Sequence, residues 1–157
     1  MKISTPHIAI ALSALCIAAL ALALIAEHVF GLRPCNLCLI QRVPFVLAAV
    51  LAAAAWRLPG RAGPLLTLAG LALAVNGGIA FYHVGVEQHW WVSAVCPAGA
   101  GAPVSVANLL EEMNKPVEVS CDTPAWSFMG ITMAALNVPF SAMLGLVTLS
   151  LTRGRRS

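Results

Sequence analysis

The stretch RPCNLCLIQR (residues 33–42) leads directly into the apolar run VPFVLAAVLAAAAW (residues 43–56). It places two cysteines three residues apart, and an arginine follows the second cysteine by four residues. Pro34 is of a type favoured at the first position of a helix, so we expect both cysteines in the first helical turn. The longer segment from Leu39 to Trp56, which contains this run, is close to the roughly 20 residues that a helix needs to cross a bilayer. The stretch therefore predicts a membrane helix that begins with a thiol pair.

The composition of the whole chain is also typical of a membrane protein. Only 10% of its 157 residues are charged and 60% are hydrophobic, whereas soluble domains carry about 25% charged residues. We therefore predict an all-α membrane protein, a bundle of four transmembrane helices that forms a single integral membrane domain over residues 1–157. Its four spans are expected at about 8–26, 39–56, 64–82 and 128–151.

The first apolar segment has a rival interpretation as a secretory signal peptide, because Lys2 precedes it. Its apolar run exceeds the roughly 7–15 residues of a signal-peptide core. The sequence that follows, EHVFGLRPC (residues 27–35), offers no convincing small-residue cleavage site. We therefore predict an uncleaved first span.

The basic residues predict how the bundle is oriented. Six of the nine flank the spans on one side, and by the positive-inside rule this side faces the cytoplasm. Both chain termini and the short 57–63 loop are then cytoplasmic, and two loops, at about 27–38 and 83–127, face the opposite side. The six residues are Lys2, Arg57, Arg61, Arg153, Arg155 and Arg156.

The long second loop contains VANLLEEM (residues 106–113). Its apolar residues follow helical spacing, and Glu111 and Glu112 fall on the other face. We predict a short amphipathic helix that lies on the outer membrane surface, with ordinary loop packing as the alternative.

Four of the five cysteines lie in the predicted non-cytoplasmic loops: Cys35, Cys38, Cys96 and Cys121. The fifth, Cys16, lies within the first span and is interpreted as an apolar core residue. Disulfides persist in oxidising compartments such as the periplasm, and four thiols allow three pairings. Structural staples are one interpretation, since a loop as long as that between Cys96 and Cys121 can stabilise by about 3.5 kcal/mol.

The pair Cys35 and Cys38 favours redox chemistry over stapling, because it closes almost no loop. A helix N-terminus carries partial positive charge, and a C-x-x-C pair placed there has a lowered thiol pKa. A zinc site of four thiolates is the alternative interpretation. It is weakened because Cys96 and Cys121 lack the close spacing usual in such sites.

Arg42 follows Cys38 by four residues, so both lie on one face of a helix. The arginine is then roughly 6 Å deeper along the helix axis. One interpretation is a snorkelling side chain that anchors the helix end. The functional interpretation is a positive group that favours a nearby thiolate and hydrogen-bonds a lipid-soluble electron acceptor.

The third span carries small residues, Gly70, Ala74 and Gly78, at every fourth position. Small residues at this spacing let two helix backbones approach closely. Asn76 in the same span is predicted to hydrogen-bond to another helix.

Several motifs taken together resemble those of the disulfide bond formation protein B (DsbB) family. They are PCNLCLIQR (34–42), YHVGVEQHWW (82–91), CPAG (96–99) and CDTPAWSFMGITMAALNVPFS (121–141). The resemblance runs through all four predicted spans and both outer loops. It implies a multi-pass thiol:quinone oxidoreductase of the bacterial inner membrane, whose partner is a soluble, thioredoxin-like periplasmic oxidase of the DsbA type.

The resemblance also implies roles for the cysteines. Cys96 and Cys121 match the loop pair that accepts electrons from DsbA, with Cys96 forming the mixed disulfide. Cys35 and Cys38 match the pair next to the quinone, with Cys38 as the thiolate that engages the quinone ring.

Two further residues match the quinone site of the family, namely Arg42 and His83. Gln41 is a departure, because some members have glutamate there. The quinone is expected to be ubiquinone or menaquinone, and neither a metal site nor nucleic-acid binding is expected.

Two other functions stay open at this point. A vitamin K epoxide reductase-like enzyme is also a four-helix quinone enzyme, but it usually carries its C-x-x-C near the final span. The non-enzymatic alternative is a structural or metal-carrying membrane protein whose cysteines are staples or ligands.

Overall fold

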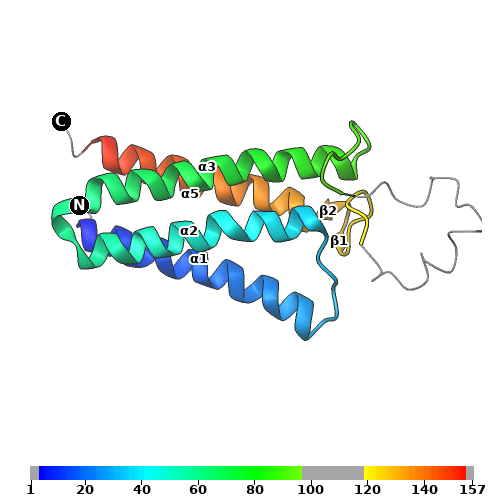
Figure 1. Cartoon of the computed structure of the whole chain (residues 1–157), viewed down its shortest axis with the longest axis horizontal. Helices are drawn as coiled ribbons and strands as arrows, with labels where there is room; N and C mark the ends of the chain where they lie inside the picture. The colour runs from blue at the N-terminus through cyan, green and yellow to red at the C-terminus, as the bar shows by residue number, and fades with distance from the viewer. Residues whose placement is uncertain (1–3, 97–118, 155–157) are drawn as a thin grey trace, which may run out of the picture.

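The computed structural model describes residues 4–96 and 119–154, and its main elements are four long helices (Figure 1). Each is long and apolar enough to cross a membrane, which confirms the predicted four-helix membrane fold. The predicted amphipathic helix at 106–113 lies outside the described residues. The long helices are α1 (Thr5–His28), α2 (Asn36–Arg57), α3 (Ala62–Glu87) and α5 (Met133–Arg153), and a 3₁₀ turn, η1 (Pro59–Arg61), joins α2 to α3.

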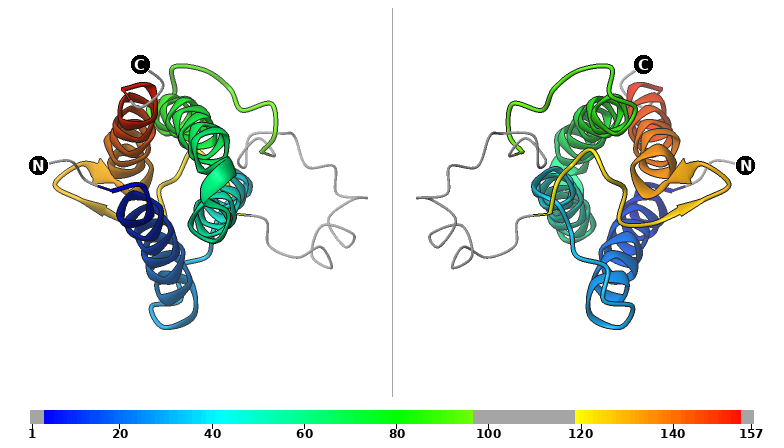
Figure 2. Two further views of the ribbon diagram at one scale, coloured as in Figure 1. Left: turned by 90° about the vertical axis from the view of Figure 1, so that its left-hand side faces the viewer. Right: turned by 90° about the vertical axis from the view of Figure 1, so that its right-hand side faces the viewer.

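The helices run side by side, with α3 between α2 and α5 (Figure 2). Helix α1 packs against α2 and diverges from it toward one end of the bundle (Figure 1). The start of α1, the turn η1 and the end of α5 share one end, and the cysteine-bearing segments share the other. An even number of spans requires this arrangement of the chain ends.

The fourth span begins later than the predicted 128–151. Residues before it form a small hairpin, in which β1 (Ser127–Phe128) pairs antiparallel with β2 (Ile131–Thr132). The hairpin turn has positive φ angles of 50° at Met129 and 80° at Gly130. Such residues do not fit a right-handed helix, so α5 begins at Met133, five residues after the expected start of the span.

The start of α5 and the end of α3 have different causes. Thr132 caps α5, because its hydroxyl accepts a hydrogen bond from the backbone N–H of Ala135 at 3.1 Å. Capping hydroxyls of this kind satisfy one of the free N–H groups of the first helical turn. Helix α3 runs past the predicted end at residue 82 as far as Glu87. Its last turn stays helical because His83 and Glu87 are buried against other elements.

Helices α3 and α5 approach closely at two of the three small residues where the sequence predicted a close approach, Gly70 and Ala74. A Cβ atom on Gly145 of α5 would lie 2.8 Å from the backbone nitrogen of Ala74 and 2.9 Å from the Gly70 oxygen. Gly78 does not take part, because nothing lies within 4 Å of a Cβ there. A four-residue step drifts by roughly 40° around a helix, so Gly77 faces α5 in place of Gly78. Its Cβ would lie 3.3 Å from an α5 backbone nitrogen.

Candidate functional site

The thiol pair stands at the N-terminal end of α2. Cys35 is the N-cap, and its sulfur accepts a hydrogen bond from the backbone N–H of Cys38 at 3.3 Å. Pro34 therefore precedes the helix, whereas the sequence had predicted it as the first helical residue. Both cysteines are free, and their Sγ atoms are 2.9 Å apart. Loss of two electrons and two protons would join them in a disulfide.

His83, from the last turn of α3, reaches Cys35. Its Nε2 atom is 3.5 Å from Cys35 Sγ, and its Nδ1 atom is 2.9 Å from the side-chain nitrogen of Gln41. An amide nitrogen only donates hydrogen bonds, so Nδ1 is the acceptor. The ring proton of neutral His83 is then on Nε2, where it points to Cys35.

Two hydrogen bonds stabilise a negative charge on Cys35. The stronger comes from the Cys38 thiol and the weaker from His83. Their combined effect exceeds that of burial, which favours the neutral thiol. Together they lower the pKa of Cys35 from its ordinary value to about 4. In the free pair Cys35 is therefore a thiolate at neutral pH, and it takes up a proton only as the pH falls through about 4.

Glu87 lies one helical turn after His83. It is buried beside the Nε2 atom of His83. Its Oε1 atom is 3.8 Å from His83 Nε2, and its Oε2 atom accepts a hydrogen bond from Thr132 at 2.6 Å. Glu87 was not predicted as a site residue, because the third span was expected to end before it. A helix extended by one turn would have placed His83 and Glu87 on the same face.

An apolar cavity of about 620 Å³ lies between α1, α2 and α5. This volume is within the range of pockets that hold small organic ligands. Cys38 and Arg42 both line it, as their spacing on one helix face predicts, and so do Gln41 and Asn137. His83 does not line the cavity; it is buried on the other side of the thiol pair, at Cys35.

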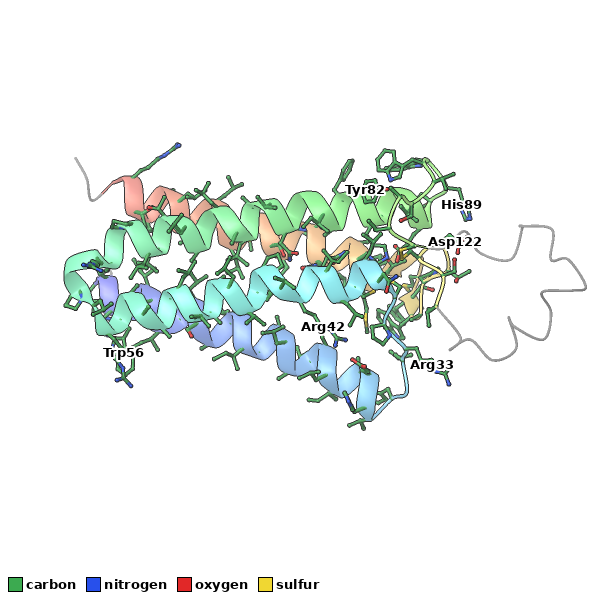
Figure 3. All side chains as sticks on the ribbon, viewed as in Figure 1. Arg33, Arg42, Trp56, Tyr82, His89 and Asp122 are labelled. Carbon is green, nitrogen blue, oxygen red and sulfur yellow. A yellow bond between two sulfur atoms is a disulfide. The ribbon has the colours of Figure 1, made fainter. Side chains whose placement is uncertain are left out.

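Arg42, which lines the cavity, forms an ion pair that joins α2 to α1. Its guanidinium is 2.7 Å from Oε2 of Glu27 on α1, and the two side chains are 21% and 29% exposed. Figure 3 shows Arg42 directed from α2 toward α1. The sequence analysis did not name Glu27 as a partner, because the contact depends on how α1 and α2 pack.

The other two loop cysteines, Cys96 and Cys121, form a disulfide. This is one of the three pairings that the sequence left open. Both sulfurs are buried in a packed cluster that also contains Cys35, Leu37 and Val86. The two cysteine pairs, which are far apart in the sequence, therefore adjoin in space.

The segment that carries Cys96 is held against the end of α3. The Trp91 indole stacks on Tyr82 with ring centroids 5.8 Å apart, and its Nε1 donates to the Tyr82 carbonyl oxygen at 3.0 Å. The Tyr82 hydroxyl in turn accepts from the backbone N–H of Ala94 at 3.2 Å. Figure 3 shows Tyr82 and His89 at this end of the bundle.

The same segment also contacts the start of α2. Asn36, beside Cys35, donates to the Val95 carbonyl at 3.4 Å. These contacts hold Cys96 over the start of α2.

The site also has a donor set that resembles a metal site. One donor atom each from Cys35, Cys38 and His83 lie within 4.8 Å of one another. However, the Sγ atoms of Cys35 and Cys38 are close enough to join in a disulfide, which would remove both as metal ligands. The predicted alternative of a four-thiolate zinc site is not formed here either, because Cys96 and Cys121 are bonded to each other. We therefore interpret the group as a redox pair with a hydrogen-bonding histidine.

Comparison with known proteins agrees with this interpretation. A family model described as "Disulfide bond formation protein DsbB" matches residues 5–151. The chain is 30% identical over 157 residues to disulfide bond formation protein B of Polaromonas naphthalenivorans (strain CJ2), which covers 95% of this chain and 92% of that protein. It is 30% identical over 153 residues to the protein of the same name from Acidovorax sp. (strain JS42), with 92% and 86% covered. No solved structure matches significantly.

The matched region contains both cysteine pairs, the first three long helices and all but the last two residues of α5. Free thiols at the top of one membrane helix and a disulfide packed beside them are the parts that thiol–disulfide exchange requires. This chain therefore belongs to the DsbB family of disulfide bond formation proteins, multi-pass membrane proteins that act as disulfide oxidoreductases.

Proposed function

We propose that this protein reoxidises a periplasmic thioredoxin-like oxidase of the DsbA type and passes the electrons to quinone in the bacterial inner membrane. One observation carries the proposal. The two cysteine pairs pack in one cluster, and Cys38 of that cluster also lines an apolar cavity beside Arg42. We also propose that both termini are cytoplasmic and that the cysteine-bearing end of the bundle faces the periplasm.

The partner protein enters at the loop disulfide. Cys96 is 8% exposed and Cys121 only 2%, so Cys96 is the more accessible sulfur. A second cavity, of about 340 Å³, is lined by both cysteines and by Trp90 and Trp91. Its aromatic walls offer a docking surface for the partner. A partner thiolate that attacks Cys96 breaks the Cys96–Cys121 bond, and Cys121 leaves as a thiolate.

The electrons then move to the membrane pair by the same chemistry. The second partner thiol displaces Cys96, which releases the oxidised partner and leaves two electrons on Cys96 and Cys121. Attack of Cys121 on an oxidised Cys35–Cys38 pair releases Cys38 as a thiolate at the cavity. Attack of Cys96 on Cys121 then restores the loop disulfide and releases Cys35 as a thiolate. The resulting bonds are those of the structure, with Cys96–Cys121 joined and the other two free.

A quinone suits the cavity and the energetics. Oxidants of the DsbA type have potentials near about −120 mV, so their reoxidation requires an acceptor that is more oxidising still. Cys38 and Arg42 would hold the quinone in the apolar cavity, with the guanidinium as a hydrogen-bond donor to a ring oxygen. A bound quinone accepts two electrons and two protons, which balances the oxidation of one partner dithiol to a disulfide.

The proposal is tested with purified protein, a reduced DsbA-type partner and a soluble quinone analogue. We expect one quinone to be consumed for each partner disulfide formed, over many turnovers. The competing metal-carrier function predicts a different result, in which added Zn²⁺ protects all four loop cysteines of the reduced protein from alkylation and quinone is not consumed. Partner oxidation that stops after a single equivalent, with quinone unchanged, would contradict the proposal.

Gly85 offers a test of how the Cys96 segment is positioned. A Cβ atom at this position would lie only 2.0 Å from the Trp91 ring, so Gly85→Ala displaces the indole from Tyr82. Lost stacking and hydrogen bonding are worth about 1–3 kcal/mol. We expect exchange between the two cysteine pairs to slow by about tenfold or more, measured by rapid-mixing of the oxidised protein with reduced partner.

The matched control is Gly78→Ala, because a Cβ there meets nothing within 4 Å. This variant is expected to exchange at the rate of the unmodified protein. Equal rates in both variants would mean that the Trp91 contact does not position Cys96.

A further inference from the structure

We infer that Gln41 is a positioning residue, which holds His83 in the tautomer with its proton on Nε2. We further infer that the direction of the Gln41 amide is set by a line of hydrogen-bonded polar side chains that ends at Asn76, deep in the bundle. We call this line the file. The role of this tautomer in catalysis rests on the proposed function, because it concerns the reactivity of Cys35. The tautomer itself is a property of the free protein.

The file consists of five hydrogen bonds that all point the same way. Each side chain between the two ends accepts from one neighbour and donates to the next, through residues from α3, α5 and α2 in turn. The donors and acceptors are Asn76 Nδ2 to Ser141 Oγ (2.9 Å), Ser141 Oγ to Asn137 Oδ1 (2.7 Å), Asn137 Nδ2 to Gln41 Oε1 (2.6 Å), Gln41 Nε2 to His83 Nδ1 (2.9 Å) and His83 Nε2 to Cys35 Sγ (3.5 Å).

Burial limits the competition of water with these bonds. Asn76 and Ser141 are fully buried, Gln41 and His83 nearly so, and Asn137 is half-buried at the wall of the apolar cavity. A buried amide that turned alone would set two nitrogens or two oxygens face to face. Reversal of any one amide therefore requires reversal of its neighbours in the file. The direction at Asn76 is in this way transmitted to the imidazole.

Both ends of the file favour the observed direction. At the deep end, Asn76 Oδ1 is buried and has no hydrogen-bond partner in the described part of the chain. Reversal would pair this oxygen but leave the Asn76 amide nitrogen without its acceptor, and buried N–H groups are left unpaired more rarely than carbonyl oxygens. At the other end, reversal would remove the N–H from Cys35. It would turn a lone pair of His83 toward the thiolate.

The charges around His83 also favour a proton on Nε2. Helix α2 contributes the sulfurs of Cys35 and Cys38, and α3 contributes Glu87, whose Oε1 is 3.8 Å from the same nitrogen. The neighbours from the α5 side are neutral: Asn137 acts through Gln41, and Thr132 binds Glu87. Among the described residues, the acidic groups near the ring therefore face Nε2 and not Nδ1.

This tautomer serves the step in which Cys35 becomes a leaving group. An N–H directed at its sulfur stabilises the thiolate that forms when the Cys35–Cys121 bond breaks. Gln41 does not touch Cys35, so it acts through His83. In a member of the family with glutamate at this position, the same ring would face a carboxylate and carry a proton on Nδ1.

The test is a ring-nitrogen NMR spectrum of the reduced, ¹⁵N-histidine-labelled protein, with the His83 signals assigned by their loss in His83→Gln. We expect Nδ1 of His83 to be unprotonated and Nε2 to be protonated. In Gln41→Glu, which keeps the shape of the side chain, Nδ1 is expected to become protonated. Ser150→Ala, an exposed position whose hydroxyl contacts only the carbonyl of its own helix at Val147, is the control and should leave the spectrum unchanged. A proton on Nδ1 in the unmodified protein would overturn the inference.

A second variant separates positioning from packing. Gln41→Met fills the same space without a hydrogen-bond donor. The proton of His83 is then no longer fixed on Nε2, and the hydrogen bond from His83 to Cys35 is weakened. The thiolate absorbance of Cys35 should then titrate about one pH unit higher, which is tenfold less thiolate on the acid side of the midpoint. An unchanged midpoint with an unchanged spectrum would also overturn the inference. Neither measurement uses partner or quinone, so both results stand whether or not the protein reduces quinone.

Discussion

Replacement of Cys38 by serine is expected to abolish steady quinone reduction. Cys38 is the cysteine that lines the apolar cavity, whereas Cys35 faces His83. A serine oxygen cannot form the Cys35–Cys38 disulfide, so electrons that reach Cys35 have no route to the cavity. The Cys96–Cys121 disulfide remains in the variant, and we expect it to oxidise one equivalent of partner and then stop. Quinone absorbance and partner thiol counts, followed together, check both parts of this result.

Two matched cysteine variants locate the block. Cys96→Ser should fail to oxidise the protein partner, yet a small dithiol that reaches Cys35 and Cys38 should still support quinone reduction. Cys16→Ala should behave as the unmodified protein, because Cys16 is a free, buried cysteine of α1 that contacts the apolar core. Steady turnover by Cys38→Ser would show that electrons leave the protein by another route.

Arg42→Leu is expected to raise the KM for quinone by about 10- to 150-fold. A hydrogen bond from a charged donor is worth about 1.5–3 kcal/mol, and each 1.4 kcal/mol is tenfold in affinity. The exchange between the cysteine pairs should be unaffected, because Arg42 lies at the cavity and not in the cysteine cluster. Initial rates over a range of quinone concentrations, beside single-turnover oxidation of the partner, measure the two quantities.

The same substitution leaves the Glu27 carboxylate without its partner at 2.7 Å. The cost is about 1–3 kcal/mol of stability, toward the lower end because both side chains are partly exposed. Glu27→Gln combined with Arg42→Leu should recover the stability but not the KM. Glu27→Gln alone should keep a low KM. Recovery of quinone affinity in the double variant would mean that Arg42 acts only as an anchor for α1, as in the snorkelling interpretation of the sequence.

The four spans were predictable because span length and hydropathy are local properties of the chain. The relation between Cys38 and Arg42 was predictable for a similar reason. Residues four apart share one face of a helix whatever the helix packs against, and both side chains do line the same cavity. The lowered pKa of a thiol at the start of α2 was predictable in part, because its largest cause, the hydrogen bond from Cys38, is local, whereas His83 comes from α3.

The ends of the spans were predicted less well, because hydropathy falls at the first polar residues. His83 and Glu87 were assigned to a loop, although they continue α3. Their polarity is compensated by Cys35, Gln41 and Thr132, which come from other parts of the chain. No window of neighbouring residues contains this information.

The partners within the site depended on tertiary packing. Cys121 could have paired with any loop cysteine, Glu27 meets Arg42 only because α1 packs on α2, and Gln41 meets Asn137 only because α5 packs nearby. The position of His83 behind the thiol pair, away from the cavity, has the same origin. Periodicity places a side chain on its own helix, but the rotation and depth of that helix against its neighbours decide which distant group it meets.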